Sequence, residues 1–100
     1  MTDDKKKILI TGASAGFGFD TAKALAQRGH TVYATMRGIT GKNQENAANL
    51  RSWAEAGGHA LHVIELDVTD TGSVEAAVAK AKELGWPKEV LILLNLDVPL

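Results

Sequence analysis

Residues 11–18 read Thr11-Gly12-Ala13-Ser14-Ala15-Gly16-Phe17-Gly18, and they lie between an apolar run at residues 8–10 and a helix-like segment at residues 17–27. Glycines in such a turn allow a tight bend, a close approach of the backbone to a ligand, and close packing of the helix on the strand. The free N–H groups and the positive end of the helix dipole attract an anion. The pattern predicts the phosphate-binding turn of a Rossmann-type fold, with a glycine turn that binds nothing as the alternative.

The glycines follow the spacing Gly-x-x-x-Gly-x-Gly, which differs from the Gly-x-Gly-x-x-Gly of many dinucleotide-binding loops. With Thr11 in front, the loop resembles the cofactor loop of the short-chain dehydrogenase/reductase family. The resemblance covers Ile8 to about Ile92 and implies that the chain corresponds to about half of a family member. It also implies a set of residues that bind a nicotinamide dinucleotide: Gly12, Ser14, Ala15, Gly16, Phe17 and Gly18.

Arg37 follows the second predicted strand, residues 31–36. An acidic residue at this strand end would bind the ribose 2′-hydroxyl of NAD, whereas an arginine can bind the 2′-phosphate of NADP with two hydrogen bonds. The sequence therefore favours NADP over NAD as the cofactor, and an exposed loop arginine without a ligand is the alternative. Thr40 and Lys42 on the following loop are placed to contact the same phosphate.

Strands and helices alternate along the rest of the chain. Further strands are expected at residues 59–66 and 90–94, and Asp70 is expected to cap the helix between them. The alternation predicts an α/β, Rossmann-like three-layer fold: a four-stranded parallel sheet of order 3-2-1-4 with three crossover helices, forming a single domain over residues 1–100. Two sets of residues at helical spacing predict buried faces: Phe17, Thr21, Ala24, Leu25 and Arg28 in the first helix, and Asn43, Ala47, Leu50 and Ala54 in the second.

Asp67 and Val68 come directly after the third predicted strand. Spacing alone makes Asp67 a turn residue, whereas the family resemblance implies that this pair contacts the adenine ring. The family ends its fourth strand with Asn-Asn-Ala-Gly, which lines the cofactor ribose. This chain has Asn95 near that position but lacks the glycine, so Asn95 is interpreted as a shifted counterpart.

The family's catalytic groups are a serine and a Tyr-x-x-x-Lys pair downstream of the fourth strand. Tyr33 is the single tyrosine of this sequence, and Arg37 rather than lysine stands four residues after it. No nucleophile–base arrangement can be assembled, so no catalytic residue is expected and the chain alone is not expected to be a complete enzyme.

With no cysteine and three histidines that lack ligand spacing, no metal site is expected.

A net charge of −1 and 45% hydrophobic residues are ordinary for a globular domain. No positive field is present to attract nucleic acid or an anionic membrane. No membrane-length apolar run or signal peptide is evident, which predicts a cytoplasmic location. The apolar edge strand at residues 90–94 predicts a homo-oligomer.

Three hypotheses for function remain. In the first, the chain is an NADP(H)-binding half-domain that lacks the catalytic half. In the second, it is an engineered or truncated scaffold that can self-associate and has no useful cofactor affinity. In the third, it is the cofactor half of an NADP-dependent oxidoreductase that another chain completes.

Overall fold

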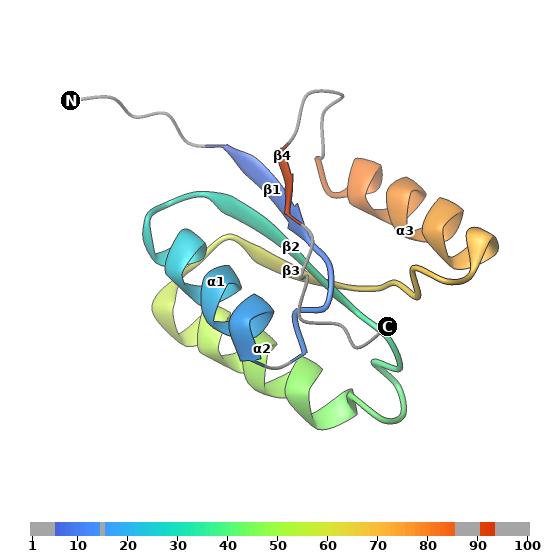
Figure 1. Cartoon of the computed structure of the whole chain (residues 1–100). Helices are drawn as coiled ribbons and strands as arrows, with labels where there is room; N and C mark the ends of the chain where they lie inside the picture. The colour runs from blue at the N-terminus through green and yellow to red at the C-terminus, as the bar shows by residue number, and fades with distance from the viewer. Residues whose placement is uncertain (1–5, 15, 86–90, 94–100) are drawn as a thin grey trace.

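Strands and helices alternate along the computed structural model, which describes residues 6–14, 16–85 and 91–93 (Figure 1). A helix connects each strand to the next parallel one, as parallel pairing requires. The elements follow in the order β1 (Lys7–Ile10), α1 (Gly16–Gln27), β2 (Thr31–Met36), α2 (Gln44–Gly57), β3 (Leu61–Glu65), α3 (Thr71–Glu83) and β4 (Leu91–Leu93).

The strands pair in parallel in the order β3-β2-β1-β4. The strands β1 to β3 form the body of the sheet, in a register that places Ile8 beside Val32 and Val32 beside Leu61. The strand β4 adds three residues beside β1 and lies within the strand predicted at residues 90–94, whose positions 90 and 94 are outside the described residues. The predicted Rossmann-like α/β fold, with parallel strands and three helices, is confirmed.

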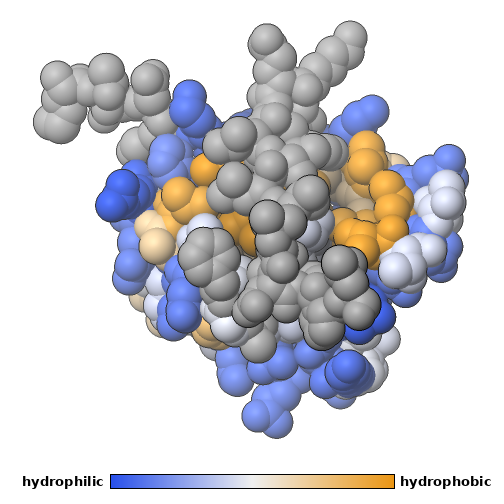
Figure 2. All heavy atoms as spheres, viewed as in Figure 1, coloured by the Kyte–Doolittle hydropathy of each residue, from blue (hydrophilic) through white to orange (hydrophobic). Residues whose placement is uncertain are grey.

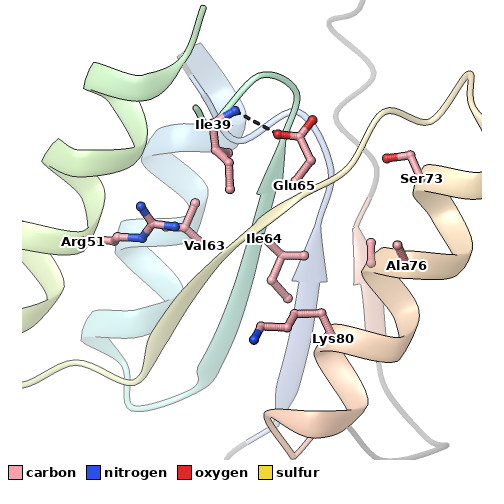
Figure 3. Close-up of a pocket in the computed structure, with 9 residues that line it drawn as sticks. Ile39, Arg51, Val63, Ile64, Glu65, Ser73, Ala76 and Lys80 are labelled. Carbon is pink, nitrogen blue, oxygen red and sulfur yellow. Dashed lines mark hydrogen bonds between the residues drawn. The ribbon is translucent and has the colours of Figure 1, made fainter. Parts of the chain in front are cut away.

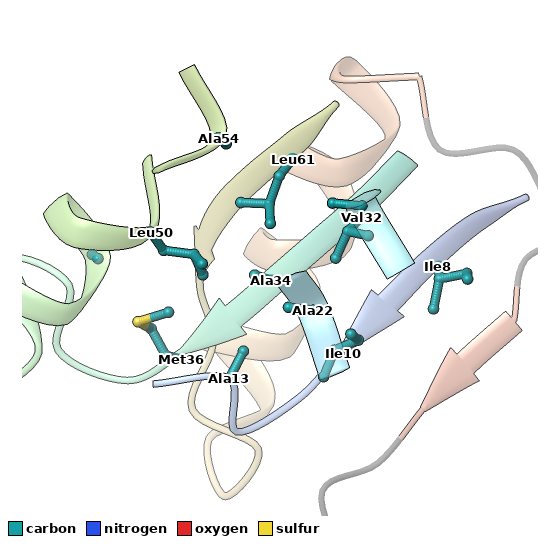
Figure 4. Packing of buried hydrophobic residues seen from close by; sticks show 12 residues of the cluster. Ile8, Ile10, Ala13, Ala22, Val32, Ala34, Met36, Leu50, Ala54 and Leu61 are labelled. Atoms are coloured by element: carbon teal, nitrogen blue, oxygen red, sulfur yellow. The ribbon is translucent and has the colours of Figure 1, made fainter. Parts of the chain in front are cut away.

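Helices cover both faces of the sheet, α1 and α2 on one side and α3 on the other (Figure 1). Successive side chains of a strand point to opposite faces. On β2, Val32 and Ala34 therefore join the core under α1 and α2, whereas Tyr33 joins the core under α3. The larger core, shown in Figure 4, contains these buried residues: Ile8, Ile10, Ala13, Ala22, Ala26, Val32, Ala34, Met36, Ala47, Leu50, Ala54 and Leu61.

The buried face of α1 differs from the predicted one. Ala22 and Ala26 are buried against the sheet, whereas Ala24 and Arg28 are exposed. Alanines at alternate positions make several stripes of this helix equally apolar, so periodicity alone cannot choose among them. The choice of Ala22 and Ala26, together with buried Gly18, lets the helix axis approach the strands closely.

The helix ends are fixed by the residues that the sequence indicates. The Asp70 carboxylate accepts hydrogen bonds from the N–H groups of Gly72 at 3.0 Å and Ser73 at 3.4 Å, which confirms its capping role. Gly29 follows α1 with a left-handed φ of 92°, a conformation that favours glycine.

The surface is mainly hydrophilic at its periphery, and hydrophobic residues show near the middle of the face in Figure 2. Among the residues that the structure describes, no helix has the length and apolarity needed to cross a membrane. Val68 is the large hydrophobic residue that stands out as exposed, with 58% of its surface accessible.

Candidate functional site

The glycine loop connects β1 to α1 at the carboxyl end of the sheet (Figure 1). Gly12 and Gly16 have φ values of 67° and 61°, a left-handed conformation that side chains with a Cβ rarely adopt. Two of the predicted loop glycines are therefore required by the backbone itself. Gly18 is buried in the first turn of α1, where a side chain would separate the helix from the sheet.

Thr35 of β2 holds the glycine loop in place. Its hydroxyl donates a hydrogen bond to the carbonyl oxygen of Ile10 at 2.7 Å, and its own carbonyl accepts one from the N–H of Ala13 at 3.0 Å. Thr35 and Ala13 are fully buried, so these bonds are shielded from water. No sequence pattern singles out Thr35, because threonine is common in strands.

The described residues place only part of the predicted loop set. Ser14 is half-buried in the loop, and Phe17 lies in the first turn of α1, although only its backbone is described. Ala15 and Asn95 lie outside the described residues.

Arg37 follows β2 directly and is exposed. Its carbonyl oxygen accepts a hydrogen bond from Nδ2 of Asn43 at 2.6 Å. The next two N–H groups, of Gly38 and Ile39, donate to the two carboxylate oxygens of Glu65, each at 2.9 Å. Asn43 therefore holds the loop before α2 instead of lying on the buried face of that helix, as its spacing had suggested.

Asp67 and Val68 follow β3. Oδ1 of Asp67 accepts hydrogen bonds from the hydroxyl of Thr69 at 2.6 Å and its N–H at 3.0 Å, and the Asp67 N–H donates to Oγ of Ser73 at 2.9 Å. The bonds from Thr69 hold the pKa of Asp67 below its usual value, and the positive charge of Arg37 acts in the same direction. Asp67 is therefore a negatively charged, preorganised turn residue near Arg37.

The carboxyl ends of β1, β2 and β3 meet at one edge of the sheet because the strands are parallel (Figure 1). This arrangement brings the glycine loop, Arg37 and the pair Asp67-Val68 together at the carboxyl ends of the strands, where an open α/β sheet binds its ligands. The charge interaction between Arg37 and Asp67 shows that the last two groups are neighbours.

Two described histidines stack on aromatic side chains. Trp53 packs against the larger core and stacks on His59, with ring centroids 4.5 Å apart. His62 stacks on Tyr33 at 5.4 Å on the opposite side of the sheet. Within the described part of the chain, no three potential ligands lie close enough together to hold a metal ion.

A hollow of ≈ 340 Å³ lies over the β3 edge of the sheet, away from the glycine loop (Figure 3). Ile39 and Glu65, which belong to the contacts behind Arg37, form part of its wall. The hollow therefore borders the Arg37 end of the candidate site but does not contain its phosphate loop.

Comparisons with known proteins agree with this geometry. A family model described as short chain dehydrogenase matches residues 6–95. Retinol dehydrogenase 12 of Mus musculus is 36% identical over 90 residues, which are 90% of this chain and 27% of that protein.

Solved structures of a ketoreductase and a dehydrogenase are also similar to this chain. A variant of actinorhodin polyketide ketoreductase with NADPH shares 28% identity and a TM-score of 0.78 over 98% of this chain and 35% of that chain. A gluconate 5-dehydrogenase from Burkholderia cenocepacia, in complex with NADP and tartrate, shares 28% identity and a TM-score of 0.69 over 90% of this chain and 33% of that chain. The chain thus spans about a third or less of these proteins, rather than the half that the sequence analysis expected.

Proposed function

Because this chain belongs to the short chain dehydrogenase family, which uses nicotinamide cofactors, we propose that it binds NADP(H) at the carboxyl ends of β1, β2 and β3. The observation that carries the proposal is the joint position of three features at that edge. These are a loop with two left-handed glycines, an exposed arginine, and a turn with a charged and an exposed apolar side chain.

Each feature suits one part of the cofactor. The loop residues Gly12, Ser14, Ala15, Gly16, Phe17 and Gly18 would hold the pyrophosphate, because N–H groups at a helix N-terminus attract anions. Asp67 and Val68 would contact the adenine, the first through hydrogen bonds and the second through its exposed apolar surface. Asn95, outside the described residues, would reach the nicotinamide-side ribose.

Arg37 supports NADP over NAD in this proposal. It is the first residue after β2, it is exposed, and no acidic residue occupies that strand end. A guanidinium group can donate two parallel hydrogen bonds to a phosphate, whereas a ribose hydroxyl would gain little from it. Two of the similar solved structures contain NADPH or NADP, which agrees with this preference.

Hydride chemistry would come from the bound nicotinamide. Tyr33 is fully buried in the sheet, and its hydroxyl donates a hydrogen bond to the carbonyl oxygen of Leu84 at 3.0 Å. It cannot reach a substrate at the carboxyl edge. We therefore propose cofactor binding as the function of this chain, with turnover dependent on groups that the described residues do not include.

The test is a fluorescence titration of the chain with NADPH and with NADH. We expect tighter binding of NADPH, and we expect Arg37→Ala to weaken NADPH binding by roughly tenfold to a hundredfold while leaving NADH unchanged, because a lost charge-assisted hydrogen bond is worth about 1.5–3 kcal/mol. Gly16→Val should weaken both cofactors, since valine is strained at a positive φ.

Arg28→Ala, at an exposed residue directly after α1, is the matched control for the change in charge and should leave both affinities unchanged. Equal affinity of the two cofactors would contradict the proposed role of Arg37 in selecting NADP, but it would still support cofactor binding at the glycine loop. No binding of either would favour the second hypothesis, a fold that has no useful cofactor affinity.

We also propose that the chain self-associates through the edge beyond β1, where β4 contributes Leu91–Leu93. The apolar sequence of residues 90–94 supports this proposal, because an exposed apolar strand edge is a template for pairing with a second chain.

A further inference from the structure

The carboxylate of Glu65 lies at the end of β3 and is fully engaged by the backbone of the loop that follows Arg37. Oε2 accepts a hydrogen bond from the N–H of Gly38 and Oε1 accepts one from the N–H of Ile39, each at 2.9 Å. Figure 3 shows the second of these bonds beside the hollow over β3. A carboxylate with two good acceptor geometries is the type of group that binds a pair of successive amides tightly.

The same loop is held from its other side by the residue before α2. Nδ2 of Asn43 donates to the carbonyl oxygen of Arg37 at 2.6 Å, and the Asn43 N–H donates to the carbonyl oxygen of Gly38 at 2.7 Å. Gly38 has a φ of 62°, which lets the chain turn back between these two contacts. The peptide groups on the carboxyl side of Arg37 are therefore fixed by β3 and by the start of α2 together.

We infer that Glu65 is a positioning residue that sets the selectivity of this site for a ribose 2′-phosphate. By fixing the backbone that carries Arg37, Glu65 reduces the conformational entropy that the loop would otherwise lose when the guanidinium binds the phosphate. Its carboxylate also accepts the hydrogen bonds of the Gly38 and Ile39 N–H groups, so these two amides are not free to bind the phosphate in place of the Arg37 side chain. This inference rests on the proposed function.

The negative charge of Glu65 and its positioning role have opposite effects on the affinity for a phosphate, so a neutral residue at position 65 distinguishes between them. A negative charge near the site repels a phosphate, so a purely electrostatic role predicts that a neutral residue at position 65 strengthens binding. Glu65 is exposed to solvent, and physiological salt screens such a repulsion. Positioning predicts that the neutral residue weakens binding.

The experiment compares adenosine 2′,5′-bisphosphate with adenosine 5′-monophosphate by calorimetric titration of the full chain. Glu65→Ala removes both acceptors and should weaken bisphosphate binding about tenfold, with a much smaller change for the monophosphate, which lacks the group that Arg37 contacts. Glu65→Gln keeps one acceptor oxygen and should give an intermediate loss. Glu55→Gln, an exposed carboxylate on α2, changes the net charge equally and should leave the ratio of the two affinities unchanged.

The ratio of the two affinities separates positioning from a structural role, because general destabilisation would weaken both ligands alike. An unchanged ratio in Glu65→Ala, or tighter bisphosphate binding, overturns the inference and leaves the proposed function standing. A parent chain that binds neither ligand overturns the proposed function, and the role of Glu65 with it.

Discussion

Tyr33, buried in the core that α3 covers, stacks on the half-buried ring of His62. Tyr33 is fully buried, its ring stacks on His62, and its hydroxyl donates to the carbonyl oxygen of Leu84 beyond the end of α3. Burial raises the pKa of Tyr33 and lowers the pKa of His62, because a low-dielectric surrounding disfavours the charged form of each. At neutral pH both groups are therefore kept uncharged in the folded protein.

The lowered pKa of His62 predicts that the fold weakens in mild acid. The relevant pH range lies between the pKa of His62 in the folded protein and its pKa in the unfolded chain, which is about 6.5. In this range His62 binds a proton more readily in the unfolded chain than in the folded protein. The free energy of unfolding therefore falls as the pH drops below that value. We expect a lower melting temperature at about pH 5.5 than at about pH 7.5, and a smaller difference in His62→Gln. An equal difference in that variant would show that other groups cause the acid sensitivity.

At the scale of the element, α3 depends on its N-terminal cap. The Asp70 carboxylate satisfies the N–H groups of Gly72 and Ser73, which no carbonyl of the helix can reach. Asp70→Ala should destabilise the fold by about 1 kcal/mol, which lowers the melting temperature of a domain of this size by about 4–8 °C. The control Glu75→Ala removes an exposed carboxylate from the same helix and should have little effect. Equal melting temperatures for Asp70→Ala and the parent chain would contradict the capping role.

Local patterns predicted most elements because each has a local cause. The strand at residues 31–36 is bounded by Gly29 and Gly38, and the structure confirms its limits. The strand predicted at residues 59–66 is shorter, since β3 begins at Leu61 and His59 stacks on Trp53 instead. The predicted buried face of α1 was correct at Leu25, which packs against the core, and wrong at Ala24 and Arg28, because the alanines of this helix give no strong periodicity.

The supports of the candidate site could not be predicted in the same way. The glycine loop has a local signal, since glycine is the residue that tolerates a left-handed backbone. The bonds of Thr35 to the loop and of Glu65 to Gly38 and Ile39 join residues that lie 22 to 27 positions apart in the sequence. Only the packing of the strands brings these partners together. The sequence offered a single indication of these contacts, the charged residue Glu65 at the end of the apolar strand β3.

At the scale of the whole molecule, the two edges of the sheet differ in how they are protected. The β3 edge is flanked by the charged side chains of Arg51, Glu65 and Lys80, which line the hollow in Figure 3. Charges beside an edge strand oppose pairing with another chain. The opposite edge is β4, whose sequence neighbourhood, residues 90–94, contains no charge. Self-association is therefore expected through β4 and not through β3.

Sedimentation velocity over a range of concentrations tests this asymmetry. We expect the mass to rise from that of one 10.6 kDa chain towards twice that value, because pairing of two β4 edges buries apolar surface from both chains. Ile92→Lys introduces a charge into β4 and should return the chain to a monomer, with circular dichroism to verify that the helices remain. Val68→Lys, at the exposed hydrophobic residue of the cofactor edge, is the control and should still associate. Loss of association in Val68→Lys alone would place the contact at the cofactor edge, and a constant monomer mass would rule out self-association altogether.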